Sequence, residues 1–303
     1  MLNEARADGS RRQCRRARAV LGLARAAAVM VATAAPLAVG ASTTGETQDL
    51  PARHVWLDAR GQPLPFQENA EIEEFLRTAR VVDRDEIGVG INKLDKLRLE
   101  KGGVEAHAVF RVVDVEENEI RVEDRLYLRF KDSWAGECAA YAVARLLGIA
   151  HVPPTVERLL DGSRGSMQIW VEEAHDPTAD GFRPPGAIAW VQQTWGMTVF
   201  DNLIFNADRN AGNMLADEQY TLWLIDHTRA FQPVADLLSP DKLERVRRRV
   251  WTRLLEISEE ELADATREYL DAGQVTALKE RRTLLVKHIQ ALIDEKGEDA
   301  VLY

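Results

Sequence analysis

The chain has 303 residues, of which 46% are hydrophobic and 29% are charged, a composition that suits one two-lobed globular domain or two small ones. Its formal net charge is −10, and because the first 40 residues carry seven arginines against two acidic residues, the rest carries −15. An acidic body argues against nucleic acid as a partner. The two cysteines, Cys14 and Cys138, exclude a disulfide framework and show no metal-ligand spacing.

Residues 1–41 are typical of a targeting segment. Five arginines between positions 11 and 18 precede an apolar run at residues 26–38, which ends in small residues. This is the pattern of a secretory signal, so we expect a periplasmic or secreted protein. The alternative is a disordered basic tail on a cytoplasmic protein. Only an uncleaved segment would tie the chain to a membrane, although the run is shorter than the roughly 20 residues of a spanning helix.

The next part of the chain, residues 42–82, is expected to form a linker and an N-terminal extension that contains a short helix at residues 71–80. Downstream segments are rich in β-branched and aromatic residues or in glycine turns, which indicate strands. These segments are residues 86–93, 104–115, 119–130 and 167–171.

A helix is predicted between the last two of these strands. Asp132 and Ser133 are suitable N-caps, and Gly148 is a suitable C-cap for a helix that continues through Leu147. Ala139 and Val143 lie on its apolar face.

The second half of the chain has mainly helical patterns. A helix is predicted at residues 191–205, with Trp195, Val199 and Leu203 as a buried stripe. Residues 214–216 and 221–225 then read as a hairpin whose second strand ends at Asp226. Three more helices are predicted, marked by residues 243–254, by the capping box of Ser258 with Glu261, and by residues 278–292.

The segment between the long helix and the end of the hairpin carries the most informative polar residues. Asp208 lies on a polar loop, Asn213 follows five residues later, and Asp226 closes an apolar strand. Phosphoryl transfer needs a group that orients the attacking hydroxyl and accepts its proton, and it needs oxygen ligands for magnesium. The alternative is a capped turn followed by an ordinary loop carboxylate.

This segment, NADRNAGNML…LWLIDH, resembles the protein-kinase-like superfamily, as do GECAAYAVARLLGIAHVPPTV and RRTLLVKHIQALIDEKGEDAVLY. The likeness is to the atypical branch of phosphoinositide 3/4-kinases, HipA-type kinases and secretory-pathway casein kinases, over about residues 83–303. It implies an α+β, two-lobed fold with a small β-rich N-lobe at residues 83–174 and a larger helical C-lobe at residues 175–303. It also implies ATP and Mg²⁺, with Mn²⁺ as the alternative ion, and a hydroxyl-bearing protein, lipid or small molecule as acceptor.

The resemblance assigns roles to the residues of this segment. Asp208 would be the catalytic group that acts on the hydroxyl, and Asn213 and Asp226 would hold the metal. Arg209, also assigned to the catalytic set, would steady the loop or contact the γ-phosphate; a surface ion pair is the alternative.

Glu137 and Arg111 match a second feature of the superfamily, a helix carboxylate that pairs with a phosphate-binding lysine. The strand HAVFR puts Arg111 at the lysine position, and arginine directs its donors differently from a compact ammonium group. Lys93 and Lys131 are the substitute cations if Arg111 does not serve. For Glu137 the alternative is a favourable interaction with the helix dipole.

The remaining residues assigned to nucleotide binding lie on either side of that strand. Gly88 and Gly90 would let backbone amides approach phosphates, unless they form a plain hairpin turn. Gln168, Val171 and Glu172 would lie behind the adenine, with Val171 as part of an apolar wall.

The sequence thus predicts an atypical ATP-dependent kinase that transfers the γ-phosphate to a hydroxyl group. A nucleotide-binding pseudokinase or partner-binding module is the alternative, because Arg111 replaces the usual lysine. Nucleotidyl transfer on the same fold is a third interpretation.

Overall fold

The structure, a computed structural model, describes residues 54–87, 94–122, 125–179, 181–184 and 186–303. Within these ranges, an antiparallel five-stranded sheet has the strand order β1-β2-β3-β7-β6. Its strands are β1 (Arg80–Ile87), β2 (Leu94–Lys101), β3 (Val104–Arg111), β6 (Thr155–Leu160) and β7 (Ser163–Ile169). Two hairpins lie outside this sheet: β4 (Asp114–Val122) with β5 (Arg125–Ser133), and β8 (Met214–Ala216) with β9 (Leu222–Leu224). The predicted signal at residues 1–41 lies outside the described residues.

One face of the sheet packs against the helix α2 (Asn69–Thr78). Leu97 and Leu99 of β2, and Ala106, Ala108 and Phe110 of β3, are buried in the apolar cluster on this side. Because successive side chains of a strand point to opposite faces, Lys96, Arg98 and Glu100 lie on the other face, and the charged residues on the α2 face, Asp95 and Lys101, lie toward the ends of the strand. This explains how the sequence LDKLRLEK forms a strand that the sequence analysis did not predict.

Residues 54–82 are part of the sheet and its core. Trp56 and Leu64 are buried in the same cluster as α2, and β1 begins at Arg80. Residues 54–82 therefore pack on the sheet, and the boundaries of the linker and N-terminal extension expected over residues 42–82 stay a prediction. The helix predicted there is present, shifted by two residues.

The helix α3 (Trp134–Leu147) follows β5 directly and has the predicted caps. The Ser133 hydroxyl accepts a hydrogen bond from the Ala135 amide at 3.3 Å, and Gly148 adopts the left-handed conformation with φ of 67°. Such a conformation favours glycine because a Cβ would be strained there. Ala139 and Val143 are fully buried, which confirms the predicted apolar face.

The second part of the chain is helical. Its helices are α4 (Ala187–Ile204), α5 (Arg248–Glu256), α6 (Glu259–Thr266), α7 (Ala272–Lys296) and α8 (Glu298–Val301), with short 3₁₀ turns at Ala211–Asn213 and Pro240–Lys242. Their apolar side chains form one cluster with those of α3. The capping box of Ser258 and Glu261 is present at the start of α6.

Two predictions for this part are wrong in detail. The helix predicted from residue 243 begins only at Arg248, because the Val246 amide donates to the Val301 carbonyl at 2.8 Å in an extended bridge. Trp195 is half-buried rather than part of the buried stripe, and its indole donates to Glu244 at 3.1 Å.

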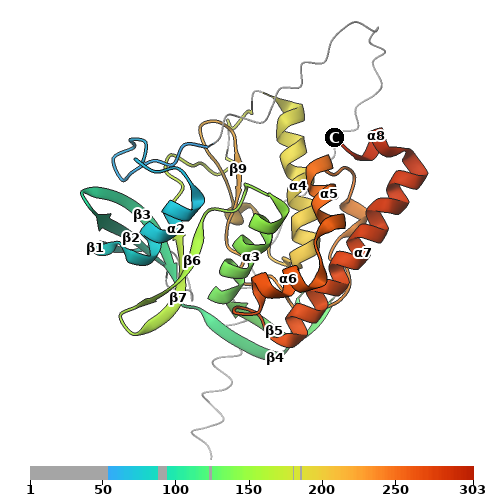
Figure 1. Cartoon of the computed structure of the whole chain (residues 1–303), viewed down its shortest axis with the longest axis horizontal. Helices are drawn as coiled ribbons and strands as arrows, with labels where there is room; N and C mark the ends of the chain where they lie inside the picture. Colours follow the sequence, from blue (N-terminus) through green and yellow to red (C-terminus); the bar gives the residue numbers. More distant parts are fainter. Residues whose placement is uncertain (1–53, 88–93, 123–124, 180, 185) are drawn as a thin grey trace, which may run out of the picture. The chain divides into compact units, whose positions relative to one another are not determined.

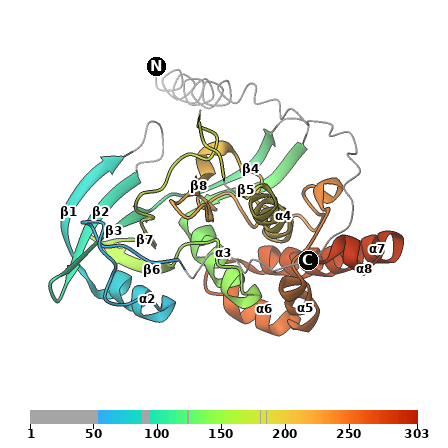
Figure 2. The same cartoon turned by 90° about the horizontal axis from the view of Figure 1, so that it is seen from above.

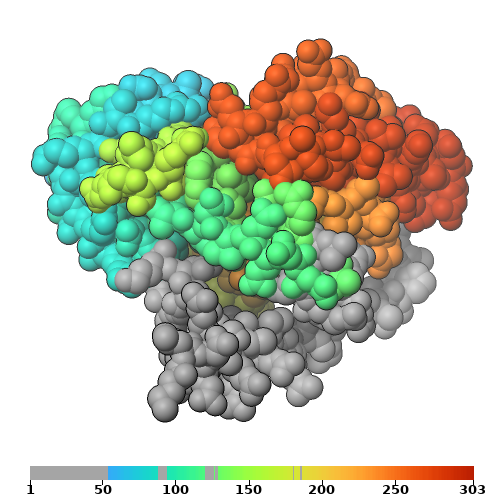
Figure 3. All heavy atoms as spheres, turned by 90° about the horizontal axis from the view of Figure 1, so that it is seen from below, coloured from blue at the N-terminus to red at the C-terminus, as the bar shows by residue number. Residues whose placement is uncertain are grey.

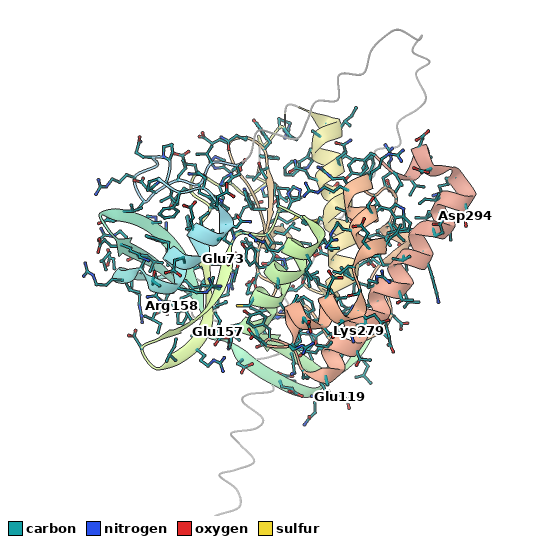
Figure 4. The ribbon with its side chains drawn as sticks, viewed as in Figure 1. Glu73, Glu119, Glu157, Arg158, Lys279 and Asp294 are labelled. Carbon is teal, nitrogen blue, oxygen red and sulfur yellow. The ribbon has the colours of Figure 1, made fainter. Side chains whose placement is uncertain are left out.

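Figures 1 and 2 show the sheet with α2 to one side of α3, and the helices α4 to α8 to the other. In Figure 3 the green β4–β5 hairpin and α3 lie between the blue sheet and the orange helices. Tyr141 of α3 donates to Glu73 of α2 at 2.8 Å, which ties the two helices together (Glu73 is labelled in Figure 4). Residues 49–303 form one compact unit, and the boundary between residues 174 and 175 stays a prediction. Among the described helices, none combines the length and apolar character needed to cross a bilayer.

Candidate functional site

The polar loop after α4 is held in shape by its own amide side chains. The helix ends at Phe205, in the left-handed conformation, and the chain turns into the loop. The Asn213 side-chain amide donates to the Asp208 carbonyl at 2.7 Å, and the Gly212 amide donates to the Asn210 side chain at 2.9 Å. Asp208 and Asn213 are therefore fixed relative to one another. The Asn213 Oδ1 atom accepts no hydrogen bond from the described residues.

Arg209 lies on the inner side of this loop, and its side chain is 8% exposed. Two of its N–H groups form a bidentate pair with Asp201, at 3.0 and 3.1 Å. The others reach the carbonyl groups of Asn213 and Ile225 and the Nε2 atom of His227. All five donors of the guanidinium are thus used. The loop-steadying role fits this position, and the alternative of a surface ion pair is wrong because the pair is buried.

Asp226 follows β9, as the hairpin pattern predicts. Its backbone φ is 57°, a left-handed conformation that costs a non-glycine residue free energy and is found at functional sites. Its Oδ1 atom accepts from the Thr228 hydroxyl at 3.1 Å, and Oδ2 accepts from Arg111 Nη1 at 3.1 Å. The side chain is 30% exposed, so the carboxylate remains accessible from solvent.

Arg111 lies between two carboxylates. Its Nε atom is 3.1 Å from Glu137 Oε1, opposite the contact to Asp226, and its side chain is 12% exposed. Neither Arg111 Nε nor Glu137 Oε1 makes an aligned hydrogen bond, although both atoms are buried. The structure thus brings together Arg111 and Glu137 as expected and adds Asp226 to the pair.

His227 links Glu137 to the loop of Arg209, a connection that was not predicted from the sequence. It is fully buried. Because an arginine can only donate, His227 Nε2 is the acceptor from Arg209, and Nδ1 donates to Glu137 Oε2 at 3.2 Å. A polar residue directly after a strand-terminal Asp was the available signal.

The ionisation of Glu137 follows from these contacts. Burial alone would raise its pKa, but the hydrogen bond from His227 and the charge of Arg111 outweigh burial, so the pKa lies below its ordinary value. Glu137 is therefore a carboxylate at neutral pH.

The first turn of α3 approaches the Asp226 loop closely: a Cβ on Gly136 would lie 2.5 Å from the His227 carbonyl oxygen.

Asp208 faces a second arginine, Arg229, which the sequence analysis did not single out. Arg229 Nη1 is 3.1 Å from Asp208 Oδ2, and its Nε is 2.9 Å from Asp132 Oδ2. Burial lowers the pKa of Arg229, but its bonds to Asp132 and the charges of Asp208 and Asp226 raise it overall. A permanent cation therefore lies beside the proposed catalytic carboxylate.

The residues assigned to the adenine region have unequal positions. Val171 is buried in the cluster with α2, together with Ala108 and Phe110, which lie on the face of β3 opposite Arg111. Its place in an apolar wall behind the adenine stays a prediction. Gln168 is buried and donates to Thr155 at 2.8 Å. Glu172 is half-buried and contacts His107.

Of the other candidate cations and glycines, only Lys131 is among the described residues. Lys131 binds Asp271 at 2.8 Å and lies 3.7 Å from Glu116, so its partners differ from those of Arg111. Gly88, Gly90 and Lys93 lie outside the described residues. Among the described residues, no three or more His, Cys, Asp or Glu side chains form a metal-binding group.

No protein-family model matches the sequence, and a comparison with curated proteins gives no match. Solved structures do match. A structure of hydra Fam20 with sugar has a TM-score of 0.59 and 16% identity, covering 80% of this chain and 94% of that one. A Golgi casein kinase with Mn and ADP bound has a TM-score of 0.60 and 14% identity, covering 77% and 78%. A second structure of the Golgi casein kinase has a TM-score of 0.58.

At such identities the likeness shows the fold. The chain has the atypical protein-kinase-like fold, an α+β architecture with an antiparallel sheet lobe and helices.

Proposed function

We propose that this chain is an atypical ATP-dependent kinase, which transfers the γ-phosphate to a hydroxyl group on an acceptor. Asp208 orients the hydroxyl and accepts its proton, and Asn213 and Asp226 offer oxygen ligands to magnesium or manganese. Arg111 contacts phosphate and Glu137 holds Arg111 in place. Phosphoryl transfer needs positioning and charge more than covalent help, which these groups can supply.

One observation carries the proposal. The Arg111 guanidinium lies against Glu137 and Asp226 together, at 3.1 Å from each, while the loop of Asp208 is joined to Glu137 through His227. Residues from a strand, a helix and two loops thus meet at one place. A plain capped turn at Asp208 would need none of these long-range contacts.

The residues present fit a magnesium nucleotide. Arg111 Nε is a buried donor without an aligned acceptor, and such a group costs free energy unless a partner such as a phosphate oxygen satisfies it. Asn213 Oδ1 is open, and Asp226 is partly exposed. Neutral and anionic oxygens are the ligands that magnesium prefers, with phosphate oxygens completing its coordination. The bound nucleotide would supply the phosphoryl group.

The protonation chemistry rests on Asp208 and Arg229. A general base must be ionised before it can accept the proton of the hydroxyl. Arg229 Nη1 donates to Asp208 Oδ2 at 3.1 Å, and the Asn210 amide donates to Oδ1 at 3.1 Å. Both contacts also fix the side chain. Asp208 therefore stays oriented until an acceptor hydroxyl competes for one of its oxygens.

A nucleotide-binding pseudokinase is the second candidate. Arg111 supports it, because its planar group is held by both Glu137 and Asp226. Arg111 thus holds Asp226, a proposed metal ligand, in an ion pair. This ion pair must loosen before Asp226 can bind a cation fully. This favours slow phosphoryl transfer, or nucleotide binding without transfer.

The two candidates separate in one experiment on the purified full chain. ATP binding is measured by calorimetry with and without Mg²⁺, and ATP turnover is measured on the same protein with hydroxyl acceptors. Asp208→Ala should keep nucleotide affinity and lose transfer, since Asp208 acts on the hydroxyl. Asp226→Asn should lose the magnesium-dependent part of the affinity. Binding without any turnover in the parent would favour the pseudokinase, and equal affinity of Asp226→Asn and parent would remove Asp226 from the site.

A further inference from the structure

The sheet face that carries Arg111 continues along β3 to a second polar cluster. Ala106, Ala108 and Phe110 point into the core, so His107 and Arg111 share the opposite face. Four residues along a strand separate them by about 13 Å. This is comparable to the separation of the terminal phosphate and the base in an extended nucleoside triphosphate. A nucleotide whose phosphates reach Arg111 can thus place its base near His107.

The chain leaves β7 beside His107, and its next residues return to the same face. The Trp170 amide donates to the His107 carbonyl at 3.0 Å. Because the Val171 side chain is buried on the α2 side, Glu172 can return to the face of His107. Lys96 of β2 lies over the Trp170 ring, with Nζ 4.3 Å from its centroid. The cluster therefore combines an aromatic surface, a cation and a carboxylate.

Glu172 is only partly used by its protein partner. Its Oε1 atom is 2.6 Å from His107 Nδ1, and the two side chains are 16% and 22% exposed. The Oε2 atom accepts no hydrogen bond from the described residues. The imidazole holds the carboxylate in one orientation, which leaves a fixed acceptor that water or a ligand must satisfy.

We propose that Glu172 is a specificity-determining residue that accepts hydrogen bonds from the edge of the nucleobase; this proposal rests on the proposed nucleotide function. Guanine presents two adjacent donors, N1–H and the 2-amino group, to a carboxylate. Adenine presents its 6-amino group beside N1, whose lone pair would face a negative oxygen. Charge-assisted hydrogen bonds are about twice as strong as neutral ones. The site therefore binds guanine nucleotides at least as tightly as adenine nucleotides.

Replacing Glu172 with glutamine should remove this preference for guanine. Glutamine in place of Glu172 has nearly the same shape but offers one acceptor oxygen and an NH₂ group, which would face a guanine donor. Selective sites lose most when a buried polar group meets the wrong partner. A His107–Glu172 pair that served only to join β3 to the turn would give no such difference between the two bases.

The test is calorimetry of the purified full chain with Mg·ATP and Mg·GTP. The parent should bind GTP as tightly as ATP or more tightly. Glu172→Gln should weaken GTP binding by about ten- to a hundredfold and change ATP affinity little. Glu172→Asp, which keeps the charge but withdraws it by one methylene, should lose part of the GTP affinity. Thermal unfolding of each variant checks that it is folded.

Glu157→Gln is the matched control, because Glu157 (labelled in Figure 4) is a half-buried carboxylate of β6 that pairs with Arg164. It should leave both affinities unchanged. A parent that binds GTP more than about tenfold more weakly than ATP, or a Glu172→Gln change that affects both nucleotides equally, overturns the base assignment while leaving the kinase proposal standing. If the parent binds neither nucleotide, the proposed function itself is overturned, and the assignment of Glu172 with it.

Discussion

The loop that carries Asp208 has an inner and an outer side, and the two differ in how far their polar groups are satisfied. On the inner side, Arg209 is 8% exposed and uses all five donors on Asp201, His227 and two carbonyl groups. On the outer side, Asp208 is 36% exposed, and Asn213, although buried, has an Oδ1 atom that accepts no hydrogen bond from the described residues. The adjacent residues Arg209 and Asp208 therefore differ in exposure and in how far their hydrogen bonds are made within the protein.

This difference separates residues that hold the geometry from residues that can bind a ligand. A group whose hydrogen bonds are all made inside the protein gains nothing from a ligand, whereas an open, oriented acceptor can exchange water for one. By this criterion Arg209 is a positioning residue. Asp208, Asn213 and Asp226 are the groups able to touch substrate or metal.

The largest effect is a loss of stability, which is expected for Arg209→Met on the inner side of the loop. Removing this guanidinium leaves the buried carboxylate of Asp201, 9% exposed, without its cation. Breaking a buried pair in this way costs about 3–5 kcal/mol in the free energy of unfolding. Urea denaturation of the full chain measures it.

Arg164→Met is the control for this change, since Arg164 is 63% exposed in its pair with Glu157, and ion pairs of exposed side chains contribute little. A loss for Arg209→Met no greater than that of the control would mean that the inner side does not hold the loop.

Several features of the site were predictable because their signals are local. The caps at Ser133 and Gly148 and the order Asp208, Asn213, Asp226 are set by neighbouring residues and by the hairpin between them. The pairing of Arg111 with Glu137 followed from the resemblance, not from any local pattern.

The missed features depend on contacts between distant parts of the chain. His227 meets Glu137 across 90 positions, and Arg229 meets Asp132 across 97. No periodicity reports such contacts. The sequence alone likewise does not show that Val171, two residues after β7, is buried in the cluster with α2.

The next largest effect is expected for Arg111, which lies between Glu137 and Asp226. Arg111→Ala should weaken ATP binding by about ten- to a hundredfold, because a charge-assisted contact of roughly 1.5–3 kcal/mol is lost. Arg111→Lys should keep most of the affinity and preserve or increase transfer. Calorimetry with Mg·ATP decides. An alanine variant that binds like the parent would place the phosphate-binding cation elsewhere.

A smaller effect is expected where α3 meets the Asp226 loop. Gly136→Ala would put a Cβ 2.5 Å from the His227 carbonyl oxygen, so helix or loop must shift. Overpacking of this kind costs about 1–3 kcal/mol. Gly196→Ala in α4 is the matched control, because its Cβ would meet nothing within 4 Å, and alanine favours a helix by about 0.5–1 kcal/mol. Thermal unfolding should show opposite signs for the two variants; a Gly136→Ala protein as stable as the control would contradict the close contact.

The smallest effect is a pH dependence of the free energy of unfolding, which arises from the contacts of Glu137 with His227 and Arg111. The pKa of Glu137 in the folded chain lies below its ordinary value of 4.5, because the His227 hydrogen bond and the Arg111 charge outweigh burial. A depressed folded-state pKa means that the unfolded chain takes up the proton first as the pH falls. The stabilisation is therefore complete above pH 4.5 and is lost as the pH falls below it, toward the folded-state value.

Unfolding free energies measured by urea denaturation between about pH 6 and 3 test this. The parent should lose stability more steeply on the acid side than Glu137→Gln, which has no carboxylate to titrate at this position. Glu119→Gln, at an exposed position of β4, should keep the slope of the parent. If the unfolding free energies of Glu137→Gln and the parent change equally with pH, Glu137 is not held as a carboxylate by His227 and Arg111. The inner side of the loop would then be held by the pair of Arg209 and Asp201 alone.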